Sequence, residues 1–299
     1  MSETADLSAA VPSAPTVAVV VPAQRAGALL ARQLDALSSQ VAAPPFTTVV
    51  VLDIDDPGAT LVESYRDRLR LLTVVVPRRG AAAARNAGVA ACDGSVLLFC
   101  DADDVVGPGW VRAMAVEVQH TGLCGSLMRV EWEVCPRWAR PFYEPDDSSS
   151  VEEFHGVVSF VVSASLGIDR ALFDAVGGFD ESFPGAGGEE VDLCLRLAAI
   201  RGSGSVIGAV VDETALVLYR PRSTFRSIAR QRAGYSRGTV RLMARHRIGE
   251  YGTLASIERR RLLRMARSPR RLAVLIWSFI ALRGEMRRQR RSPGATTAE

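Results

Sequence analysis

The sequence contains no lysine, so all 36 of its basic residues are arginines. It has only three histidines, and its five cysteines form an odd set without a Cys-x-x-Cys pair. Zinc sites and disulfide frameworks are built from cysteines and histidines at short, paired spacings. We therefore expect reduced thiols that pack as small apolar side chains, and neither a zinc centre nor a disulfide scaffold.

Long apolar runs are also missing. The apolar stretch at 272–282 falls well short of the roughly 20 residues that a membrane-spanning helix needs. Residues 1–15 carry acidic side chains and lack the basic residues with which a signal peptide begins. This composition predicts a disordered tail instead of a signal peptide. We expect a cytoplasmic protein, with peripheral attachment to the inner face of the membrane as an alternative.

The arginines are distributed unevenly along the 299 residues. Residues 1–219 hold 15 arginines against 29 acidic residues, whereas residues 220–291 hold 21 arginines against three glutamates. A basic block of this kind commonly faces phosphate in a nucleotide, an anionic lipid or a nucleic acid. Because 48% of the residues are hydrophobic, a globular core is expected, and we predict a body at 16–219 and a helical, arginine-rich extension at 220–299.

Strand-like and helix-like segments alternate through the first hundred residues. Alternation at this spacing is typical of βαβ units with right-handed crossovers, and it predicts an α/β fold with a mostly parallel sheet and flanking helices. Ligands bind to such sheets at the carboxyl ends of the strands. The predicted strands occupy residues 17–21, 47–52, 71–76 and 95–100, and the predicted helices occupy 25–40, 59–70 and 81–91.

The pattern after residue 105 is less regular. The segment 132–150 is rich in Pro, Trp, Asp and Ser, and it predicts a loop over the site. Further along we expect a strand at 157–163, helices at 170–176 and 189–200, and a helical last third with breaks at Pro221 and Pro269.

The strongest local motif is FCDADD at residues 99–104. In an extended segment, residues two apart project to the same side, so Asp101 and Asp103 can converge on one cation. Their carboxylate oxygens suit Mg²⁺ or Mn²⁺. A solvated acidic turn would explain the motif equally well on its own, but its position at the end of a buried strand favours a metal site.

Two more motifs fall near the same predicted edge. Asp53 ends the second strand, where a carboxylate can accept hydrogen bonds from a base or ribose; Asp55 and Asp56 fit a simple turn. The motif GAAAARNAG at 80–88 has an alanine face for packing on the sheet, and Arg85 offers a planar fork that could reach a diphosphate.

The fourth motif, GGFDESFPGAGGEEVDLCLRL, covers residues 177–197. Gly187 and Gly188 precede a predicted helix that opens with Glu189 and Glu190. Acids are favoured at a helix N-terminus by the helix dipole, which would account for the pair without any function. Alternatively, one of the two carboxylates points into the cleft and acts as a general base.

Taken together, VVVPAQR, VVVLD, ARNAG, DADD, VGGFDESF and GEEVDLCLRL resemble, in order and spacing, the motifs of the inverting family 2 glycosyltransferases. The resemblance covers about residues 17–232, and it implies the GT-A fold of the nucleotide-diphospho-sugar transferases. It also implies transfer of a sugar from a nucleotide-sugar donor to an acceptor hydroxyl with inversion, aided by Mn²⁺ or Mg²⁺. Cell-envelope, exopolysaccharide or glycolipid synthesis would be the setting, and the acceptor would be a sugar, a lipid-linked molecule or a small molecule.

By this resemblance Asp53 would hold the nucleobase, Arg85 would lie near the diphosphate, and Glu190 would be the catalytic base. The family usually has Asp where Glu190 stands, and many members have a His where this chain has Leu218. The resemblance assigns the metal to Asp103 and Asp101, the donor to Pro22, Asp53, Arg85, Asp101, Arg220 and Arg222, catalysis to Glu190, and the acceptor side to Glu189. Without a His at position 218, the metal would be held chiefly by Asp103, water and the donor's phosphates. The three histidines that the chain does contain are predicted to be surface or loop residues.

Several alternatives stay open at the level of sequence. Residues 272–282 could lie in an anionic membrane interface, or form a core helix that packs on the body. Nucleic acid is not expected as a partner, because the arginine-rich region has few interleaved aromatic residues. The rival functions are a nucleotidyltransferase, and a catalytically silent module that binds a nucleotide sugar or a membrane surface.

Overall fold

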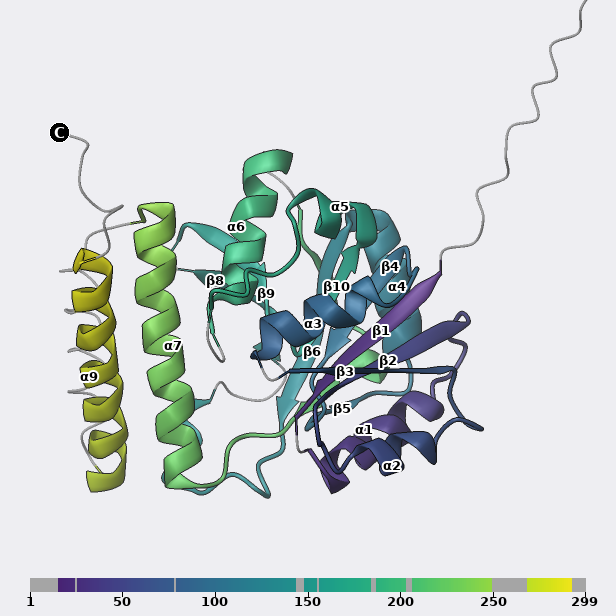
Figure 1. Cartoon of the computed structure of the whole chain (residues 1–299), viewed down its shortest axis with the longest axis horizontal. Helices are drawn as coiled ribbons and strands as arrows, with labels where there is room; N and C mark the ends of the chain where they lie inside the picture. Colours follow the sequence, from purple (N-terminus) through teal and green to yellow (C-terminus); the bar gives the residue numbers. More distant parts are fainter. Residues whose placement is uncertain are drawn as a thin grey trace, which may run out of the picture.

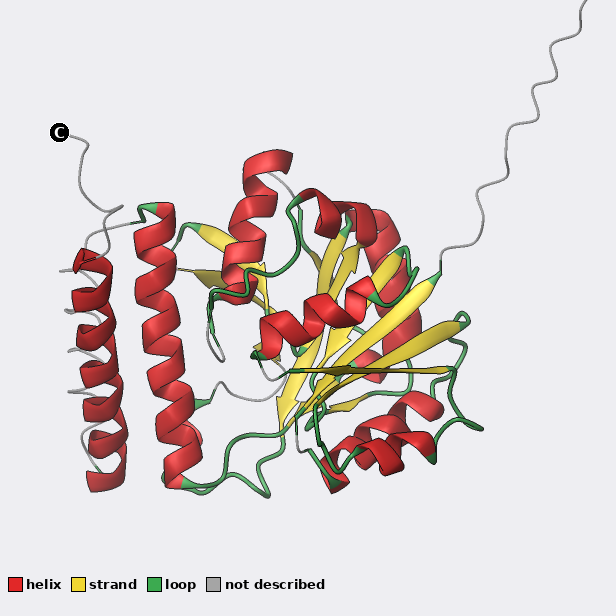
Figure 2. Ribbon diagram, viewed as in Figure 1, coloured by secondary structure: helices red, strands yellow, loops and turns green. Residues whose placement is uncertain are grey.

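A mixed ten-stranded sheet, with helices packed against its two faces, forms the body of the protein (Figures 1 and 2). The computed structural model describes residues 16–24, 26–77, 79–143, 148–154, 156–183, 187–202, 206–248 and 268–291. Along the sheet the strands follow the order β3-β2-β1-β4-β10-β6-β12-β5, and β7 and β11 pair with β6. The predicted tail at 1–15 lies outside the described residues, as do His155 and part of the C-terminal quarter.

The first half of the chain forms the predicted parallel strands with their connecting helices. The strands β1, β2, β3 and β4 lie side by side in parallel, which confirms the prediction of βαβ units. Their bounds are β1 (Val17–Ala23), α1 (Ala28–Ser38), β2 (Phe46–Asp53), α2 (Ala59–Glu63), β3 (Leu71–Val76), α3 (Ala81–Ala90) and β4 (Val96–Cys100).

Two local predictions in this half were wrong. Helix α2 ends at Glu63 instead of reaching residue 70, and the Ser64 hydroxyl donates a hydrogen bond to the Leu61 carbonyl, an alternative partner that competes with helix continuation. Strand β1 continues through Pro22 instead of stopping before it. Proline is tolerated there because the pairing of β1 with β4 ends at Val20, so only the β2 side remains hydrogen-bonded.

Strand β1 shows how the sheet divides two apolar cores. Val19 and Val21 face a core shared with α1, whereas Ala18 and Val20 face a second core shared with α3 and α6. All four side chains are at most 1% exposed. The sequence of a strand that is buried on both faces is typically a continuous apolar run, and the sequence of β1 has this pattern.

The second half adds antiparallel strands to the sheet. Strand β10 lies between β4 and β6 and runs antiparallel to both. The segment 132–150, predicted as a loop, contains a 3₁₀ turn and a short strand paired with β6. The elements are β5 (Val105–Val106), α4 (Trp110–Thr121), β6 (Leu123–Val130), η1 (Arg140–Phe142), β7 (Ser148–Ser149), β8 (Val151–Phe154), β9 (Val158–Val161), β10 (Ser165–Asp169), α5 (Arg170–Ala175), α6 (Glu189–Arg201), β11 (Gly208–Val210), η2 (Glu213–Ala215) and β12 (Val217–Tyr219).

Two long helices, α7 (Phe225–His246) and α9 (Pro269–Arg291), lie side by side at the C-terminal side of the body (Figure 1). Val274 and Leu275 of α9 pack against Ile228 of α7. The carboxylate of Glu285, 2% exposed, accepts a hydrogen bond of 3.1 Å from Arg241 of α7. One face of the predicted helix at 272–282 therefore packs as a core helix does.

The opposite face of α9 carries an exposed apolar stripe, Leu272, Ile276, Trp277 and Ile280. Trp277 and Ile280 are 60% and 61% exposed. Among the described helices, none is long and apolar enough to cross a membrane.

Candidate functional site

A cavity of about 410 Å³ opens at the carboxyl ends of β1, β2 and β4. This is the edge at which ligands bind to sheets of this kind. All nine residues that the sequence analysis singled out for the site line this cavity: Pro22, Asp53, Arg85, Asp101, Asp103, Glu189, Glu190, Arg220 and Arg222. Residues separated by up to 200 positions in the chain thus meet in one place, whereas Leu218 is not among the lining residues.

The first two aspartates of the DADD motif each face an arginine side chain. Asp101 Oδ1 lies 2.8 Å from Arg85 Nη2, and Asp103 Oδ2 lies 2.6 Å from Arg222 Nη1. The two pairs differ in exposure, because the side chain of Arg85 is 3% exposed and that of Arg222 is 48% exposed. Arg85 is therefore fixed in the core and meets Asp101 at the cavity wall, whereas Arg222 lies where solvent and ligands can reach it.

A third acid, Asp104, ties this motif to the C-terminal part of the chain. It is 1% exposed, and its Oδ1 accepts a 2.7 Å hydrogen bond from the backbone N–H of Arg220, while Oδ2 is buried without a hydrogen-bond partner among the described residues. Burial, followed by the charges of Asp103 and Asp101, raises the pKa of Asp104 well above its usual value. Burial also raises the pKa of Asp103, and Arg222 offsets part of that rise.

This donor set fits a hard divalent cation. Carboxylate oxygens on Asp101 and Asp103 face the cavity, and the pKa shifts show that the acids repel one another. Within the described residues, no group of three or more His, Cys, Asp or Glu side chains could hold a metal. Any cation here would therefore complete its shell with water and substrate oxygens, as Mg²⁺ and Mn²⁺ commonly do.

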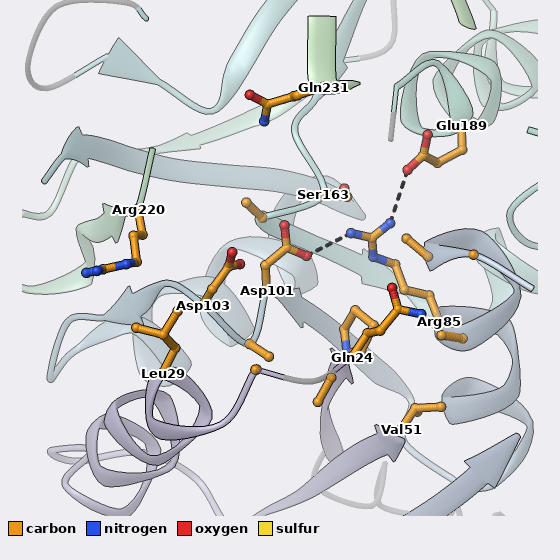
Figure 3. Close-up of a pocket in the computed structure, with 18 of the residues that line it drawn as sticks. Gln24, Leu29, Val51, Arg85, Asp101, Asp103, Ser163, Glu189, Arg220 and Gln231 are labelled. Atoms are coloured by element: carbon orange, nitrogen blue, oxygen red, sulfur yellow. Dashed lines mark hydrogen bonds and ion pairs between the residues drawn. The ribbon is translucent and has the colours of Figure 1, made fainter. Parts of the chain in front are cut away.

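Arg85 bridges Asp101 of the DADD motif to Glu189 of helix α6, as Figure 3 shows. Its Nη2 donates to Asp101, and its Nη1 lies 3.3 Å from Glu189 Oε1. The ring of Phe179 lies 5.6 Å from the guanidinium carbon. Arg85 can be held here because α3 sits close to the sheet: a Cβ on Gly88 would lie 2.6 Å from Val20.

The two glutamates at the start of α6 differ in environment. Glu189 is 2% exposed, and its oxygens are taken by Arg85 and by the Gly187 N–H at 3.0 Å. Glu190 is less buried as a residue, but its Oε2 is buried without a hydrogen-bond partner in the described structure. Burial, followed by the charge of Glu189, raises the pKa of Glu190 well above its usual value. Of the two glutamates, Glu190 is thus the one with a carboxylate oxygen that no described group engages.

The start of α6 is anchored to α7 through Asp192. This carboxylate is fully buried, and it lies 2.7 Å from His246 Nε2 and 2.8 Å from Arg196 Nε. The prediction that the histidines are surface or loop residues was wrong for His246, which ends helix α7 in contact with a buried acid. The contact holds the helix that carries Glu189 and Glu190 in place.

Four further lining residues were missed by the sequence analysis. Gln24 Nε2 donates a 2.7 Å hydrogen bond to Asp53, which sets the orientation of that carboxylate. Gln231 Nε2 lies 3.2 Å from the hydroxyls of both Tyr219 and Tyr235. A sequence signal for this trio was the four-residue spacing of Gln231 and Tyr235, which places them on one helix face.

An α/β sheet with paired aspartates after its fourth strand is the architecture of the GT-A glycosyltransferases, and the comparisons with known proteins agree with it. The family profile described as Glycosyl transferase family 2 matches residues 18–177. The chain belongs to glycosyl transferase family 2. This membership argues against the nucleotidyltransferase alternative.

Curated relatives match at about 30% identity. A validoxylamine A glucosyltransferase of Streptomyces hygroscopicus subsp. limoneus is 30% identical over 235 residues, which are 66% of this chain and 51% of the relative. A pre-mycofactocin glycosyltransferase of Mycobacterium tuberculosis is 30% identical over 175 residues, 56% of this chain and 36% of the relative. The chain thus spans about half or less of the length of these relatives.

Solved structures share the fold at lower sequence identity. TarS of S. aureus aligns with a TM-score of 0.55 at 16% identity, covering 93% of this chain and 55% of TarS. The mannosyltransferase PcManGT from Pyrobaculum calidifontis, solved with GDP-Man and Mn²⁺, aligns with a TM-score of 0.55 at 18% identity, covering 95% and 76%. These likenesses confirm the predicted GT-A fold.

Proposed function

We propose that the chain is an inverting, metal-assisted glycosyltransferase that moves a sugar from a nucleotide-sugar donor to an acceptor hydroxyl. The observation that carries the proposal is the buried, unpartnered Oε2 of Glu190 at the wall of a cavity that also holds Asp53, Asp101 and Asp103. Support comes from the fold neighbours, whose structures contain GDP-Man with Mn²⁺ or UDP-GlcNAc.

The reaction is an in-line displacement at the anomeric carbon. The acceptor oxygen forms its bond to that carbon while the bond to the diphosphate oxygen breaks, and Glu190 takes the hydroxyl proton. A single displacement inverts the configuration at this carbon. A divalent cation at Asp101 and Asp103 would neutralise charge on the departing nucleoside diphosphate. Asp53 is placed to hold the nucleobase or ribose, and Arg222 to face the phosphates.

The test is a screen of nucleotide sugars by thermal shift with Mn²⁺, followed by assays of donor hydrolysis and transfer. A donor raises the melting temperature because it binds only the native state. Binding with neither hydrolysis nor transfer would favour the catalytically silent module. Failure of every common nucleotide sugar to bind would contradict the proposal.

Among the three acceptor classes we favour a small molecule, because the curated relatives are each named for a single compound, validoxylamine A and pre-mycofactocin. Synthesis of cell-envelope glycans, exopolysaccharides or glycolipids remains the alternative setting.

The division into a domain at 16–219 and an extension at 220–299 also remains a proposal. Helix α7 lies beyond that boundary and supplies lining residues to the cavity.

Arg222→Gln is expected to tighten Mn²⁺ binding by the donor-free protein about two- to fivefold. Arg222 occupies Asp103 Oδ2 at 2.6 Å and competes with a cation there, and a partly exposed pair is worth about 0.5–1 kcal/mol. Isothermal titration with MnCl₂ measures the change. Arg220→Gln is the matched control, because the Arg220 guanidinium pairs with Glu131 at 2.7 Å instead. Equal Mn²⁺ affinity in Arg222→Gln and the unsubstituted protein would show that the pair does not compete.

Peripheral attachment to an anionic membrane is proposed for helix α9. Its exposed stripe includes Trp277 and Ile280, and arginines flank it, a combination suited to an acidic lipid surface. The full chain is expected to co-sediment with acidic vesicles, less so at high salt, and the double variant Trp277→Ser, Ile280→Ser to lose most of this binding. Val116→Ser, at a 47% exposed position on α4, is the control. Absence of binding to acidic vesicles would remove the membrane proposal.

A further inference from the structure

The first turn of α6 carries the proposed base but begins at a residue that cannot cap it. Gly188, the N-cap residue, is in the left-handed region with φ 102° and has no side chain for the free N–H groups of the turn. The Asp192 N–H donates a 2.9 Å hydrogen bond to the Gly188 carbonyl and closes the turn. Because the Oε2 of Glu190 has no partner among the described residues, the place of that carboxylate follows the turn that carries it. The position of Glu190 therefore depends on what holds this turn from outside.

Helix α7 holds the chain on the N-terminal side of this turn. It lies between α9 and the body of the protein (Figure 1), and it packs against both α9 and α6. Its Gly238 meets the backbone of Gly187 directly, since a Cβ on Gly238 would lie 2.0 Å from the Gly187 carbonyl oxygen. One turn further along α7, Arg241 donates a hydrogen bond to the Ser182 carbonyl. The segment that leads into Glu190 is thus fixed to α7 by main-chain contacts.

His246, in the last turn of α7, holds the other side. Its Nε2 lies 2.7 Å from Asp192 Oδ1, and because a carboxylate offers only acceptors, the imidazole donates this hydrogen bond. The Asp192 carboxylate is fully buried, whereas the imidazole is 21% exposed. The end of α7 is itself closed, because the N–H of Arg247, which has φ 54°, donates to the Met243 carbonyl. A fixed helix end therefore meets the residue that closes the turn of Glu190.

Two arginines also reach the Asp192 carboxylate, but they are less suited to fix it. Arg196 Nε lies 2.8 Å from Asp192 Oδ2, but Arg196 belongs to α6 itself and moves with that helix. Arg245 of α7 lies farther away, with its Nε 3.4 Å from Asp192 Oδ1. Its side chain is 47% exposed, and it also pairs with Asp180. His246 thus makes the shorter of these two contacts between Asp192 and α7.

We propose that His246 is a positioning residue for sugar transfer, which acts through Asp192 on the place of the Glu190 carboxylate. The inference rests on the proposed glycosyltransferase function, in which Glu190 takes the proton of the attacking hydroxyl. His246 is not among the residues that line the cavity of the site, so its effect reaches the reaction through the base. A misplacement of about 1 Å at a reacting group can cost on the order of 100-fold in rate. Loss of the contact should therefore lower kcat and leave the KM of the donor nearly unchanged.

The test compares substitutions of His246 in the full chain. The probes are UDP-glucose, UDP-GlcNAc and GDP-mannose with Mn²⁺, and the readout is donor hydrolysis, in which water takes the place of the acceptor. In His246→Ala, kcat is expected to fall about 10- to 100-fold with the donor KM within about twofold of the unsubstituted value. His246→Gln keeps an N–H donor at a similar reach and should recover kcat to within about threefold, whereas the shorter His246→Asn should not. His120→Ala, at an exposed position in the last turn of α4, is the matched control and should change neither constant.

A double substitution tests whether the effect passes through the base. When His246→Ala is added to Glu190→Gln, kcat should fall by no more than about twofold further, because the base is already absent. A general loss of structure would instead cost the same factor in both backgrounds. Leu282→Ala gives the comparison for stability, since this side chain is 1% exposed in the contact between α7 and α9. It is expected to lower the melting temperature and to leave kcat unchanged.

The outcomes separate this inference from the proposed function. If the unsubstituted protein neither binds nor hydrolyses any of the three donors, the glycosyltransferase proposal fails, and the role of His246 fails with it. If a donor is hydrolysed and kcat of His246→Ala stays within about twofold of the unsubstituted value, the positioning role alone is overturned. An equal loss in the Glu190→Gln background would overturn it as well. Should His246→Ala not fold, His246→Asn carries the same comparison with His246→Gln.

Discussion

Glu190→Gln is expected to lose at least about 100-fold in the rate of sugar transfer, with donor affinity nearly unchanged. Gln has the shape of Glu but cannot take a proton, so only the base function is removed. The Oε2 of Glu190 is buried and has no hydrogen-bond partner among the described residues, so the substitution leaves no broken ion pair behind it. Transfer assays at saturating donor and acceptor, with donor binding followed by thermal shift, measure both quantities.

The matched control is Glu189→Gln, one residue earlier on the same helix turn. It removes the negative charge that faces Arg85 and is expected to lower the melting temperature, because the buried guanidinium loses one of its two carboxylate partners. An inactive Glu189→Gln together with an active Glu190→Gln would reverse the assignment of the base.

The pH dependence of transfer follows from the same carboxylate. A general base acts in its ionised form, and burial with the charge of Glu189 raises the pKa of Glu190. The rate of transfer by the unsubstituted protein should therefore rise with pH, and the rise should continue to a pH above the ordinary pKa of a glutamate. A rate that is flat through this range would argue against Glu190 as the base.

Asp103→Ala is expected to abolish transfer and to weaken donor binding only when a divalent cation is present. Asp103 faces the cavity, and Asp101 is the only other carboxylate of the DADD motif that lines it. Loss of one of two carboxylates should therefore remove most of the cation affinity. The measurement is the donor affinity of the variant and of the unsubstituted protein, each in Mn²⁺ and in EDTA. The affinities are expected to differ between the two proteins in Mn²⁺ and to agree in EDTA.

The control for this substitution is Asp55→Ala, in the turn that follows β2 and outside the lining of the cavity. It should behave as the unsubstituted protein does. Equal donor affinity of the unsubstituted protein with and without Mn²⁺ would show that donor binding does not depend on the metal, and the assignment of Asp101 and Asp103 would then have to be withdrawn.

Much of the site was predictable because its residues follow strands. Asp53 and Asp101 come directly after apolar runs, and parallel strands end at a common edge, so their proximity follows from the sequence pattern alone. The placement of Glu190 at a helix start was likewise visible in the two glycines that precede it.

The remainder of the site depends on contacts that no local pattern encodes. Strand β10 enters the sheet between β4 and β6, and its pairing joins residues more than 60 positions apart. The Gln231 amide meets the hydroxyls of Tyr219 and Tyr235, and each of the three looks like an ordinary core or helix residue in the sequence. The pairing of Arg85 with both Asp101 and Glu189 is of the same kind, since it needs the helices α3 and α6 to be placed first.

The contact of Gly187 with Gly238, where a Cβ on Gly238 would lie 2.0 Å from the Gly187 carbonyl oxygen, has a consequence for engineering the site. Side chains can change rotamer to widen or narrow a passage, but two main chains in contact have no such freedom, because their separation is set by atomic radii. The spacing between α7 and the start of α6, which carries Glu189 and Glu190, is therefore fixed at this contact. Variant libraries that aim to change the substrates of the site should leave both glycines unchanged.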